Sequence, residues 1–378
     1  MFFHGDHPTK LIFEEGALDC KGSLLQSLGD RVLNVTGKTG AAASGALADV
    51  LQALDSNDQA FRIFDGISAN PTVSSVRQAA AAARAFEADF IVAVGGGSVM
   101  DAAKAAALLA GSNLTNRQHF EPDESCTPLP VVAVGITAGT GSEVTDIAVL
   151  TIEETGRKQR LSCKKLYPSI AFSDWRYTES LPERITVSAG LDALCHLLES
   201  WFSPEFDSRA ERDCLSGAAL ALRQLSRLED RPHAWSDREF RRKMSEASLF
   251  GGYAIDRCHT SFPHLAGYAL TEEAGLPHGL ACAVFLPVLM DLAAEYAPER
   301  CEILKQATDF SVQQIAELAD YLVQEDYFAH PFRFPPEQLE KQLPRYEQSA
   351  HRMRTPGQLS GEELLQLADD RLALLFSE

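Results

Sequence analysis

Two residues with metal-binding side chains stand four positions apart in an otherwise apolar stretch of this sequence. Asp192 and His196 lie in the segment GLDALCHLLE, which begins at Gly190 and places leucines on both sides of the pair. In an α-helix, residues four apart share one face with an axial rise of about 6 Å, so a carboxylate and an imidazole can converge on one cation. The alternative to metal binding is that Asp192 and His196 form an ion pair on the surface of a helix. The surrounding leucines favour burial, and a buried polar strip needs a partner such as a metal ion.

Two further histidines extend this pair to an Asp/His/His/His set. His264 and His278 stand beside small or apolar residues such as proline and glycine, outside any charged run. Imidazoles with one carboxylate suit a divalent first-row ion better than Mg²⁺ or Ca²⁺, which prefer oxygen ligands. We therefore expect one Fe²⁺ or Zn²⁺ ion to be bound by the set Asp192, His196, His264 and His278.

Two glycine-rich loops indicate a second site, for a phosphate-bearing ligand. Residues 90–104 read FIVAVGGGSVMDAAK, a predicted strand that runs into three glycines and then a helix. Glycines let the backbone approach an anion, and the free N–H groups at the helix start face it. Ordinary tight turns use the same residues, so one such loop is weak evidence. A second loop, TAGTGSE at 137–143, follows another predicted strand, and ligands of open α/β sheets bind at the carboxyl ends of strands.

The elements that position these residues change in type near residue 178. Before it, short β-rich runs alternate with helical stretches, which predicts a Rossmann-like parallel sheet with helices on both faces. The predicted strands are Lys10–Phe13, Val32–Val35, Phe61–Phe64, Phe90–Val94 and Val131–Val134. The predicted helices are Leu18–Leu28, Ala41–Leu54, Val73–Phe86 and Met100–Leu109.

After this point only helical patterns occur. They are predicted at 187–203, 208–226, 237–252, 279–296, 311–325 and 360–375. We therefore expect an α/β dinucleotide-binding domain at 1–178 and an all-α metal-binding domain at 179–378.

Composition limits the classes of partner. The 378 residues include 34 basic and 53 acidic residues, a net charge of −19 that argues against nucleic acid or an anionic membrane as a partner. Eight cysteines without a Cys-x-x-Cys pair favour reduced thiols over a zinc ribbon or a disulfide scaffold. No secretory signal and no apolar run of membrane-spanning length is recognisable, so we expect a cytoplasmic protein.

Four sequence blocks resemble the iron-containing alcohol dehydrogenase family, which shares its fold with glycerol dehydrogenases and dehydroquinate synthases. The blocks are FDG…NPT at 64–72, GGGSVMDAAK at 95–104, TAGTGSEVT at 137–145 and the Asp/His/His/His set, which matches the family's metal ligands one for one. The resemblance implies an NAD(P)-linked oxidoreductase that acts on a small alcohol or aldehyde and forms a homodimer. By matching motif positions, it assigns cofactor binding to Asn70, Gly96, Gly97, Ser98, Asp101, Thr137, Thr140 and Ser142.

Two positions depart from the family pattern. Tyr268 stands where the family usually has a histidine, four residues after the third ligand, so a proton relay through that histidine is not expected. Gly37 and Lys38 stand after the second strand, where NAD-preferring members tend to carry an acidic residue. An acid there binds the ribose 2′-OH and repels a 2′-phosphate, so its replacement by glycine and lysine favours NADP(H) over NAD(H). The alternative is that Gly37 only serves a turn and that Lys38 points into water.

The residues allow direct hydride transfer assisted by a Lewis acid. The metal would polarise a carbonyl oxygen or stabilise an alkoxide, while the nicotinamide C4 gives or takes a hydride. Tyr268 and His259 are the candidate catalytic side chains: Tyr268 would orient substrate or water, and His259 would either contact substrate or have a structural role. Cys195 and Cys258 are interpreted as core thiols.

Other functions share some of these features. One stretch, LDALCHLLESWFS at 191–203, resembles the branch of the family that acts on phosphonoacetaldehyde or hydroxyethylphosphonate. A zinc-dependent enzyme like glycerol dehydrogenase is a second alternative, and a lyase like dehydroquinate synthase a more distant one. A nucleotide-binding protein without catalytic activity would be expected to have lost metal ligands, and all four are present.

Overall fold

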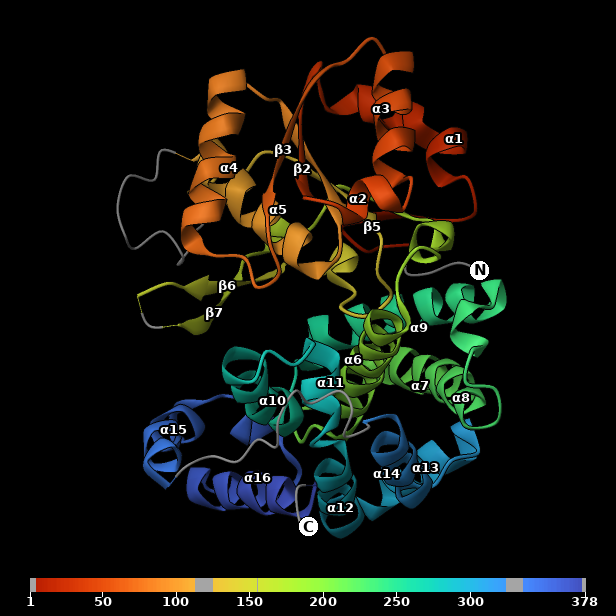
Figure 1. Ribbon diagram of the computed structural model, residues 1–378, viewed down its shortest axis with the longest axis vertical. Helices are drawn as coiled ribbons and strands as arrows, with labels where there is room; N and C mark the ends of the chain where they lie inside the picture. Colours follow the sequence, from red (N-terminus) through yellow and green to blue (C-terminus); the bar gives the residue numbers. More distant parts are fainter. Residues whose placement is uncertain (1–4, 113–124, 155, 324–335, 376–378) are drawn as a thin grey trace. The chain divides into compact units, whose positions relative to one another are not determined.

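The chain divides into two compact units, Met1–Leu181 and Pro182–Glu378, coloured along the sequence in Figure 1. The structure is a computed structural model and describes residues 5–112, 125–154, 156–323 and 336–375, with side chains of the last range from residue 342 onward. None of the helices formed by these residues combines the length and the apolar character that crossing a membrane requires.

The first unit is built on a six-stranded parallel sheet with the strand order β1-β8-β5-β4-β2-β3. Its strands are β1 (Lys10–Phe13), β2 (Arg31–Gly37), β3 (Ala60–Ile67), β4 (Phe90–Gly95), β5 (Val131–Gly135) and β8 (Ile170–Ser173). The predicted parallel α/β fold of this part of the chain is confirmed. Since β4 and β5 are neighbours with Gly95 opposite Gly135, the two glycine-rich loops begin side by side.

Helices cover both faces of this sheet because successive side chains of a strand point in opposite directions. In β4, Phe90, Val92 and Val94 belong to the core shared with α1, α2 and α3, whereas Ile91 and Ala93 belong to the core shared with α4 and α5. Figure 1 shows these two groups of helices on opposite sides of the strands. The helices are α1 (Ala17–Lys21), α2 (Gly40–Ala43), α3 (Ala46–Ser56), α4 (Val73–Phe86) and α5 (Gly97–Gly111).

Two helices predicted as continuous are interrupted at glycines. The stretch Leu18–Leu28 begins as α1 and continues from Gly22 as a 3-10 helix, at a point where an added Cβ would lie 2.9 Å from the Cβ of Ala53. The stretch Ala41–Leu54 is divided into α2 and α3 by Gly45, whose φ of 82° is not helical. The prediction of two unbroken helices is therefore wrong, because Gly45 takes a left-handed conformation and Gly22 allows a close approach to Ala53 of α3.

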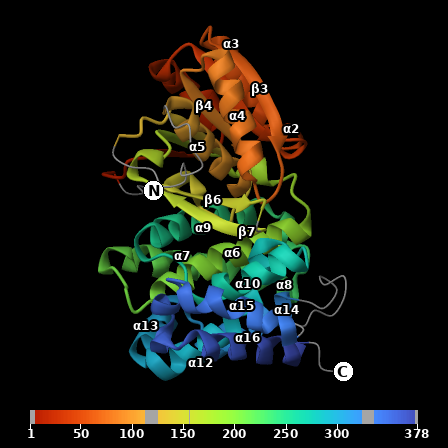
Figure 2. The ribbon, with the colours of Figure 1, turned by 90° about the vertical axis from the view of Figure 1, so that its left-hand side faces the viewer.

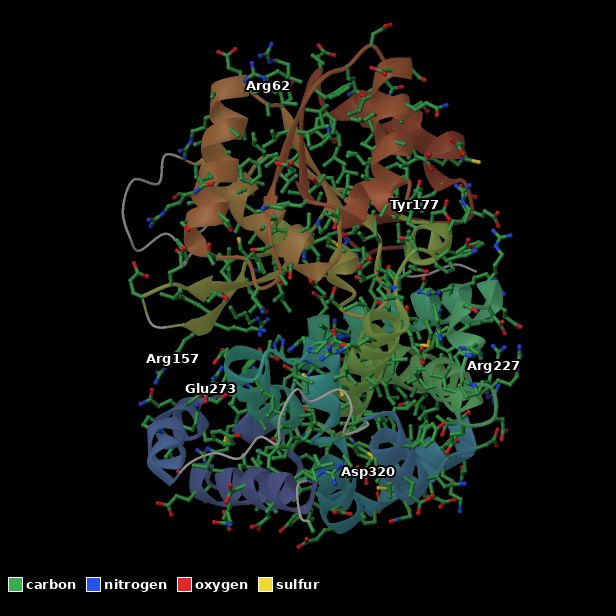
Figure 3. All side chains as sticks on the ribbon, viewed as in Figure 1. Arg62, Arg157, Tyr177, Arg227, Glu273 and Asp320 are labelled. Carbon is green, nitrogen blue, oxygen red and sulfur yellow. The ribbon has the colours of Figure 1, made fainter. Side chains whose placement is uncertain are left out.

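Three strands of the first unit are not predicted from the sequence. β6 (Ile147–Ile152) and β7 (Arg157–Ser162) form an antiparallel pair, and the sequence of β7, RKQRLS, lacks apolar alternation. This pair is visible in Figure 2. β8 has four residues and is inserted between β1 and β5, where long-range pairing defines it. After β8, the hydroxyl of Tyr177 donates to Asp49 of α3 over 2.7 Å, in the region where Figure 3 labels Tyr177.

The described residues of the second unit form helices and turns without a strand. The first group is α6 (Glu183–Phe202), α7 (Glu211–Leu225), α8 (Arg227–Asp230), α9 (Arg238–Cys258) and α10 (Phe262–Glu273). The second group is α11 (His278–Ala283), α12 (Leu286–Tyr296), α13 (Pro298–Thr308), α14 (Val312–Leu322), α15 (Pro336–Gln348) and α16 (Gly361–Leu375). The all-α prediction for this half is confirmed, and α15 and α16 lie side by side in Figures 1 and 2.

The prediction of one helix over 279–296 is wrong in detail. Phe285, with φ −100° and ψ 3°, separates α11 from α12. Pro287 lies in the first turn of α12, where a backbone N–H would have no partner within the helix, so proline is tolerated there. The separate helices α10, α13 and α15 are also absent from the predicted set. As a result, α11 is a short independent helix that begins at His278, a predicted metal ligand.

Candidate metal and cofactor sites

The carboxylate of Asp192 lies at the centre of the four predicted metal ligands. Its Oδ1 is 3.7 Å from Nε2 of His196 and 3.6 Å from Nε2 of His264. The same oxygen is 3.9 Å from Nε2 of His278. These distances exceed those of hydrogen bonds, whereas ligand bonds of about 2.1 Å to one tetrahedral ion place donor atoms about 3.4 Å apart. The structure therefore brings the three imidazoles within 3.9 Å of one carboxylate oxygen, close to the spacing of donor atoms around a shared ion.

Glycines allow the helices that carry these residues to approach closely. Asp192 and His196 lie on α6, His264 on α10, and His278 is the first residue of α11. A Cβ on Gly279 would lie 1.8 Å from the carbonyl oxygen of Ser188 and 2.8 Å from the backbone nitrogen of Asp192. Any larger residue at 279 would therefore force the start of α11, and His278 with it, away from α6.

Two atoms that face each other in this cluster have no hydrogen-bond partner. Oδ1 of Asp192 and Nε2 of His264 are both buried, and each residue is 3% exposed. A buried polar atom without a partner costs about 1–3 kcal/mol, more when it is charged. A cation between the two atoms would satisfy both, so the cluster fits the metal ion that the sequence predicts.

Glu199 orients the imidazole of His264. Its Oε1 lies 2.6 Å from Nδ1 of His264, and its Oε2 accepts hydrogen bonds from Ser261, over 2.6 Å from the backbone N–H and 3.2 Å from the hydroxyl. An ionised carboxylate only accepts hydrogen bonds, so Nδ1 carries the proton and the lone pair of the neutral ring is on Nε2, toward Asp192. Glu199 is not among the site residues predicted from the sequence. Its position, two helical turns after Asp192 on the same face of α6, is the pattern that could have found it.

The charge state of Asp192 suits a cation site. Burial raises the pKa of this carboxyl, but the adjacent imidazoles of His196, His264 and His278 lower it by more. The net pKa of Asp192 therefore lies well below its ordinary value, and the group is ionised at neutral pH.

A cysteine also stands in this cluster. Asp192, His264, His278 and Cys282 have donor atoms that all lie within 4.8 Å of one another, and Sγ of Cys282 is 3.8 Å from Nδ1 and 3.9 Å from Nε2 of His278. Nearly equal distances to both ring nitrogens place the sulfur beside the ring of His278. Burial raises the pKa of the Cys282 thiol. Cys282 is not among the site residues predicted from the sequence, because only the packing of α11 against α6 brings it here.

The two thiols interpreted as core residues are buried. Cys195 is 0% and Cys258 1% exposed, and burial raises the pKa of both thiols. A thiol with a raised pKa is a poor nucleophile at neutral pH. Both residues therefore have the properties of structural cysteines.

Tyr268 lies against the cluster as part of a series of rings. Its ring is nearly parallel to that of His278, at 8° and 6.0 Å between centroids, and the guanidinium of Arg345 lies 5.0 Å from its centroid. Burial raises the pKa of the Tyr268 phenol, so it stays neutral at physiological pH. His259 ends α9 with a φ of 61° and a ψ of −172°, a conformation uncommon for a residue other than glycine.

The two glycine-rich loops of the first unit pack against each other. A Cβ on Gly96 would lie 2.9 Å from Oγ1 of Thr137, and one on Gly97 would lie 2.8 Å from Oγ1 of Thr140. Gly97 is also the first residue of α5, whose N-terminal N–H groups follow directly. Threonine hydroxyls and helix N–H groups at the carboxyl ends of β4 and β5 form a suitable cradle for an anion.

Asp101 and Ser142 join these loops to each other. Oδ1 of Asp101 accepts from the hydroxyl of Ser142 over 2.8 Å, and Oδ2 accepts from the N–H of Val149 over 2.8 Å. Lys104, 0% exposed, donates to the hydroxyl of Ser142 over 2.8 Å and to the carbonyl of Ile147 over 2.9 Å. Asp101 and Lys104, both on α5, therefore hold the second loop against that helix. This structural role was not predicted from the sequence.

The remaining predicted cofactor residues lie at the same end of the sheet. The hydroxyl of Ser98 accepts from the N–H of Asn70, whose φ is 55°, over 3.3 Å. Gly37 is the last residue of β2, and a Cβ there would lie 3.1 Å from the carbonyl oxygen of Ile67. Lys38 follows it and is exposed.

Comparison with known proteins shows the family of this chain. Residues 8–175 match the family described as iron-containing alcohol dehydrogenase, and residues 186–325 match the C-terminal part of the Fe-containing alcohol dehydrogenase family. The 4-hydroxybutyrate dehydrogenase of Cupriavidus necator is 33% identical over 297 residues, which are 76% of this chain and 76% of that protein. Across such curated relatives, the matched region spans between 66% and 76% of the relative's own length.

Two solved structures resemble the chain over nearly its whole length. An iron-containing alcohol dehydrogenase from Thermotoga maritima has a TM-score of 0.87 at 32% identity, covering 98% of this chain and all (100%) of that one. A sulfoacetaldehyde reductase from Bifidobacterium kashiwanohense, solved with NAD⁺, has a TM-score of 0.84 at 26% identity and covers 100% of both chains. The chain therefore belongs to the iron-containing alcohol dehydrogenases, a family of oxidoreductases with alcohol or aldehyde dehydrogenase activity.

Proposed function

We propose that this chain is an NADPH-linked aldehyde reductase and alcohol dehydrogenase that holds one Fe²⁺ ion in its Asp/His/His/His set. The observation that carries the proposal is the convergence of three imidazole Nε2 atoms within 3.6–3.9 Å of Oδ1 of Asp192. When bound, the ion supplies Lewis-acid polarisation of a carbonyl group. Fe²⁺ is preferred to Zn²⁺ because of the family to which the chain belongs.

The protein's own residues have separate roles in this proposal. Asp192 and the three histidines bind the ion, and Glu199 holds His264 in the tautomer that binding requires. Tyr268 borders the site with a neutral phenol that can orient substrate or a water molecule. Gly96 and Gly97 hold the cofactor pyrophosphate beside Thr137 and Thr140, and Ser142 and Asp101 support that loop.

The choice of NADPH rests on Gly37 and Lys38 at the end of β2. No carboxylate stands at these positions to repel a 2′-phosphate, and the exposed ammonium of Lys38 can contact one. We further propose a cytoplasmic homodimer, as expected from the sequence.

A short aldehyde with an anionic group is the more specific substrate that we propose. Two relatives are named for small compounds with an anionic group, the alcohol 4-hydroxybutyrate in one case and the aldehyde sulfoacetaldehyde in the other. In this chain the guanidinium of Arg345, which is paired with Glu272, lies 5.0 Å from the centroid of the Tyr268 ring, and that ring borders His278. Phosphonoacetaldehyde, suggested by the sequence at 191–203, belongs to this class.

Two measurements test the proposal. Protein purified anaerobically should contain about one iron per chain and reduce aldehydes with NADPH faster than with NADH. The substrate panel should include propionaldehyde, succinic semialdehyde, sulfoacetaldehyde and phosphonoacetaldehyde. Glycerol and the substrate of dehydroquinate synthase should be assayed as comparisons for the two alternative functions. Zinc with glycerol oxidation would favour the glycerol dehydrogenase-like alternative, and phosphate release without net nicotinamide oxidation would favour the lyase.

A further inference from the structure

His351 is held by two hydroxyl groups in the segment that follows α15. Its Nδ1 lies 2.7 Å from Oγ of Ser349, and its Nε2 lies 3.1 Å from Oγ1 of Thr260. Both ring nitrogens therefore have hydroxyl partners that can donate or accept. The side chain is half-buried, so its imidazole can also exchange protons with water.

Two routes connect this imidazole to the candidate metal site. Its ring meets the ring of Tyr268 edge to face, at 89° and 6.1 Å between centroids, and Tyr268 in turn lies parallel to His278. On the other side, Thr260 directly precedes Ser261, which bonds to Glu199, the partner of His264. His351 thus contacts Tyr268 and Thr260, which border the site, although 91 positions separate it from Thr260 in sequence.

Aldehyde reduction consumes a proton as well as a hydride. The hydride's electron pair forms the new C–H bond, the π electrons of the carbonyl move to oxygen, and that oxygen takes up one proton. The Asp/His/His/His set is assigned to the ion, and the phenol of Tyr268 is neutral. An imidazole ordinarily titrates near pH ~6.5 and is the usual side chain for proton transfer at neutral pH.

We propose that His351, acting through the hydroxyl of Thr260, supplies the proton that aldehyde reduction consumes; this inference rests on the proposed function. The Thr260 hydroxyl gives its proton to the oxygen of the forming alcohol, and Nε2 of the imidazolium replaces it. Nδ1–H of the resulting neutral ring donates to Ser349, and water returns a proton to Nε2. His351 is therefore a positioning residue for proton transfer, because Thr260 makes the contact.

Among the described residues, charged groups lie on the elements that neighbour His351. On α10, Tyr268 faces it, and Glu272 forms a two-bond ion pair with Arg345 of α15 over 2.9 and 3.1 Å. In the turn that follows His351, Arg354 is paired with Glu205 over 3.1 Å. Arg352 lies between His351 and Arg354 in the sequence.

The test compares variants of the metal-loaded, full-length protein. His351→Gln keeps an N–H donor for Thr260 but cannot titrate, and His233→Gln removes an exposed histidine of the same unit as a control. We expect His351→Gln to lower kcat for aldehyde reduction by about 10²-fold or more, the range of general acid catalysis, with iron content and KM within twofold of wild type. In the wild type, kcat should decline as pH rises above the imidazole pKa, and this decline should be absent in His351→Gln. Free imidazole in the assay should restore activity to His351→Ala.

A second pair of variants tests the route through Thr260. Thr260→Val removes the hydroxyl with little change in shape and should lower kcat as His351→Gln does, and Thr260→Ser should recover most of that loss. An active wild type whose His351→Gln variant keeps its kcat and pH profile overturns this inference alone. Loss of iron in His351→Gln also overturns it, because the role is then structural. A wild type without aldehyde reduction overturns the proposed function and this inference together.

Discussion

Oε1 of Glu199 lies 2.6 Å from Nδ1 of His264, and this contact determines which ring nitrogen faces Asp192. Glu199→Gln would keep a hydrogen-bond acceptor but remove the charge that favours the required tautomer. We expect a loss of about 10–100-fold in metal affinity, as is typical for partners of metal-bound histidines. Titration with Fe²⁺ or Co²⁺ under anaerobic conditions measures it. Glu246→Gln, which neutralises a buried carboxylate paired with Lys243, should leave the affinity unchanged.

The second prediction concerns the ligands themselves. His264→Ala should lose metal and activity together, because Nε2 of His264 faces Oδ1 of Asp192 without a hydrogen-bond partner. The measurement is metal content per chain after anaerobic purification, with His233→Gln as the control. One ion per chain in His264→Ala would show that the ligand assignment is wrong.

The third prediction concerns Tyr268. Because burial raises the pKa of its phenol, Tyr268→Phe should leave the pH profile unchanged across an assay window of about pH 6–8. Turnover should fall by less than about tenfold, since only an orienting hydroxyl is lost. Tyr321→Phe, at an exposed tyrosine, is the matched control. A new or shifted ionisation in that window would contradict a neutral role for the phenol.

The fourth prediction concerns cofactor choice. Gly37→Asp places a carboxylate at the end of β2 and should lower kcat/KM for NADPH by about tenfold or more, the equivalent of about 1.5–3 kcal/mol. An added Cβ there would lie 3.1 Å from the carbonyl oxygen of Ile67, so Gly37→Ala is needed to measure the steric effect alone. A wild-type preference for NADH, or an unchanged NADPH value in Gly37→Asp, would show that this position does not set the choice.

The fifth prediction concerns the stability of the loop that carries Glu143. Burial raises the pKa of this carboxyl from its ordinary value of 4.5 to about 7. The folded protein therefore binds more protons than the unfolded chain between these pH values, and stability falls as pH rises through this window. The full effect is about 3 kcal/mol. Denaturation at several pH values should show a smaller decline for Glu143→Gln than for wild type or for Glu154→Gln, an exposed control.

Local sequence patterns predicted the parts of this protein whose structure depends on neighbours in the chain. The spacing of Asp192 and His196 placed both on one face of α6, and the glycines after β4 and β5 indicated tight loops at strand ends. Strand and helix periodicity is a local property, so the α/β first unit and the helical second unit could be predicted. The interruptions at Gly22 and Gly45 were not predicted, because a glycine within a helical pattern does not reveal whether it continues or ends the helix.

Residue types and their spacing were enough to indicate the chemistry of the candidate sites: one carboxylate and three imidazoles for an ion, and two glycine-rich loops for a nucleotide. Which other groups join the metal cluster depends on how the helices pack. Cys282 joins the cluster through the packing of α11, and His351 lies against Tyr268 through the packing of the segment after α15. Such contacts connect residues far apart in the chain and leave no periodic trace in it. The close approach that Gly279 permits between α11 and α6 is likewise a property of two packed backbones.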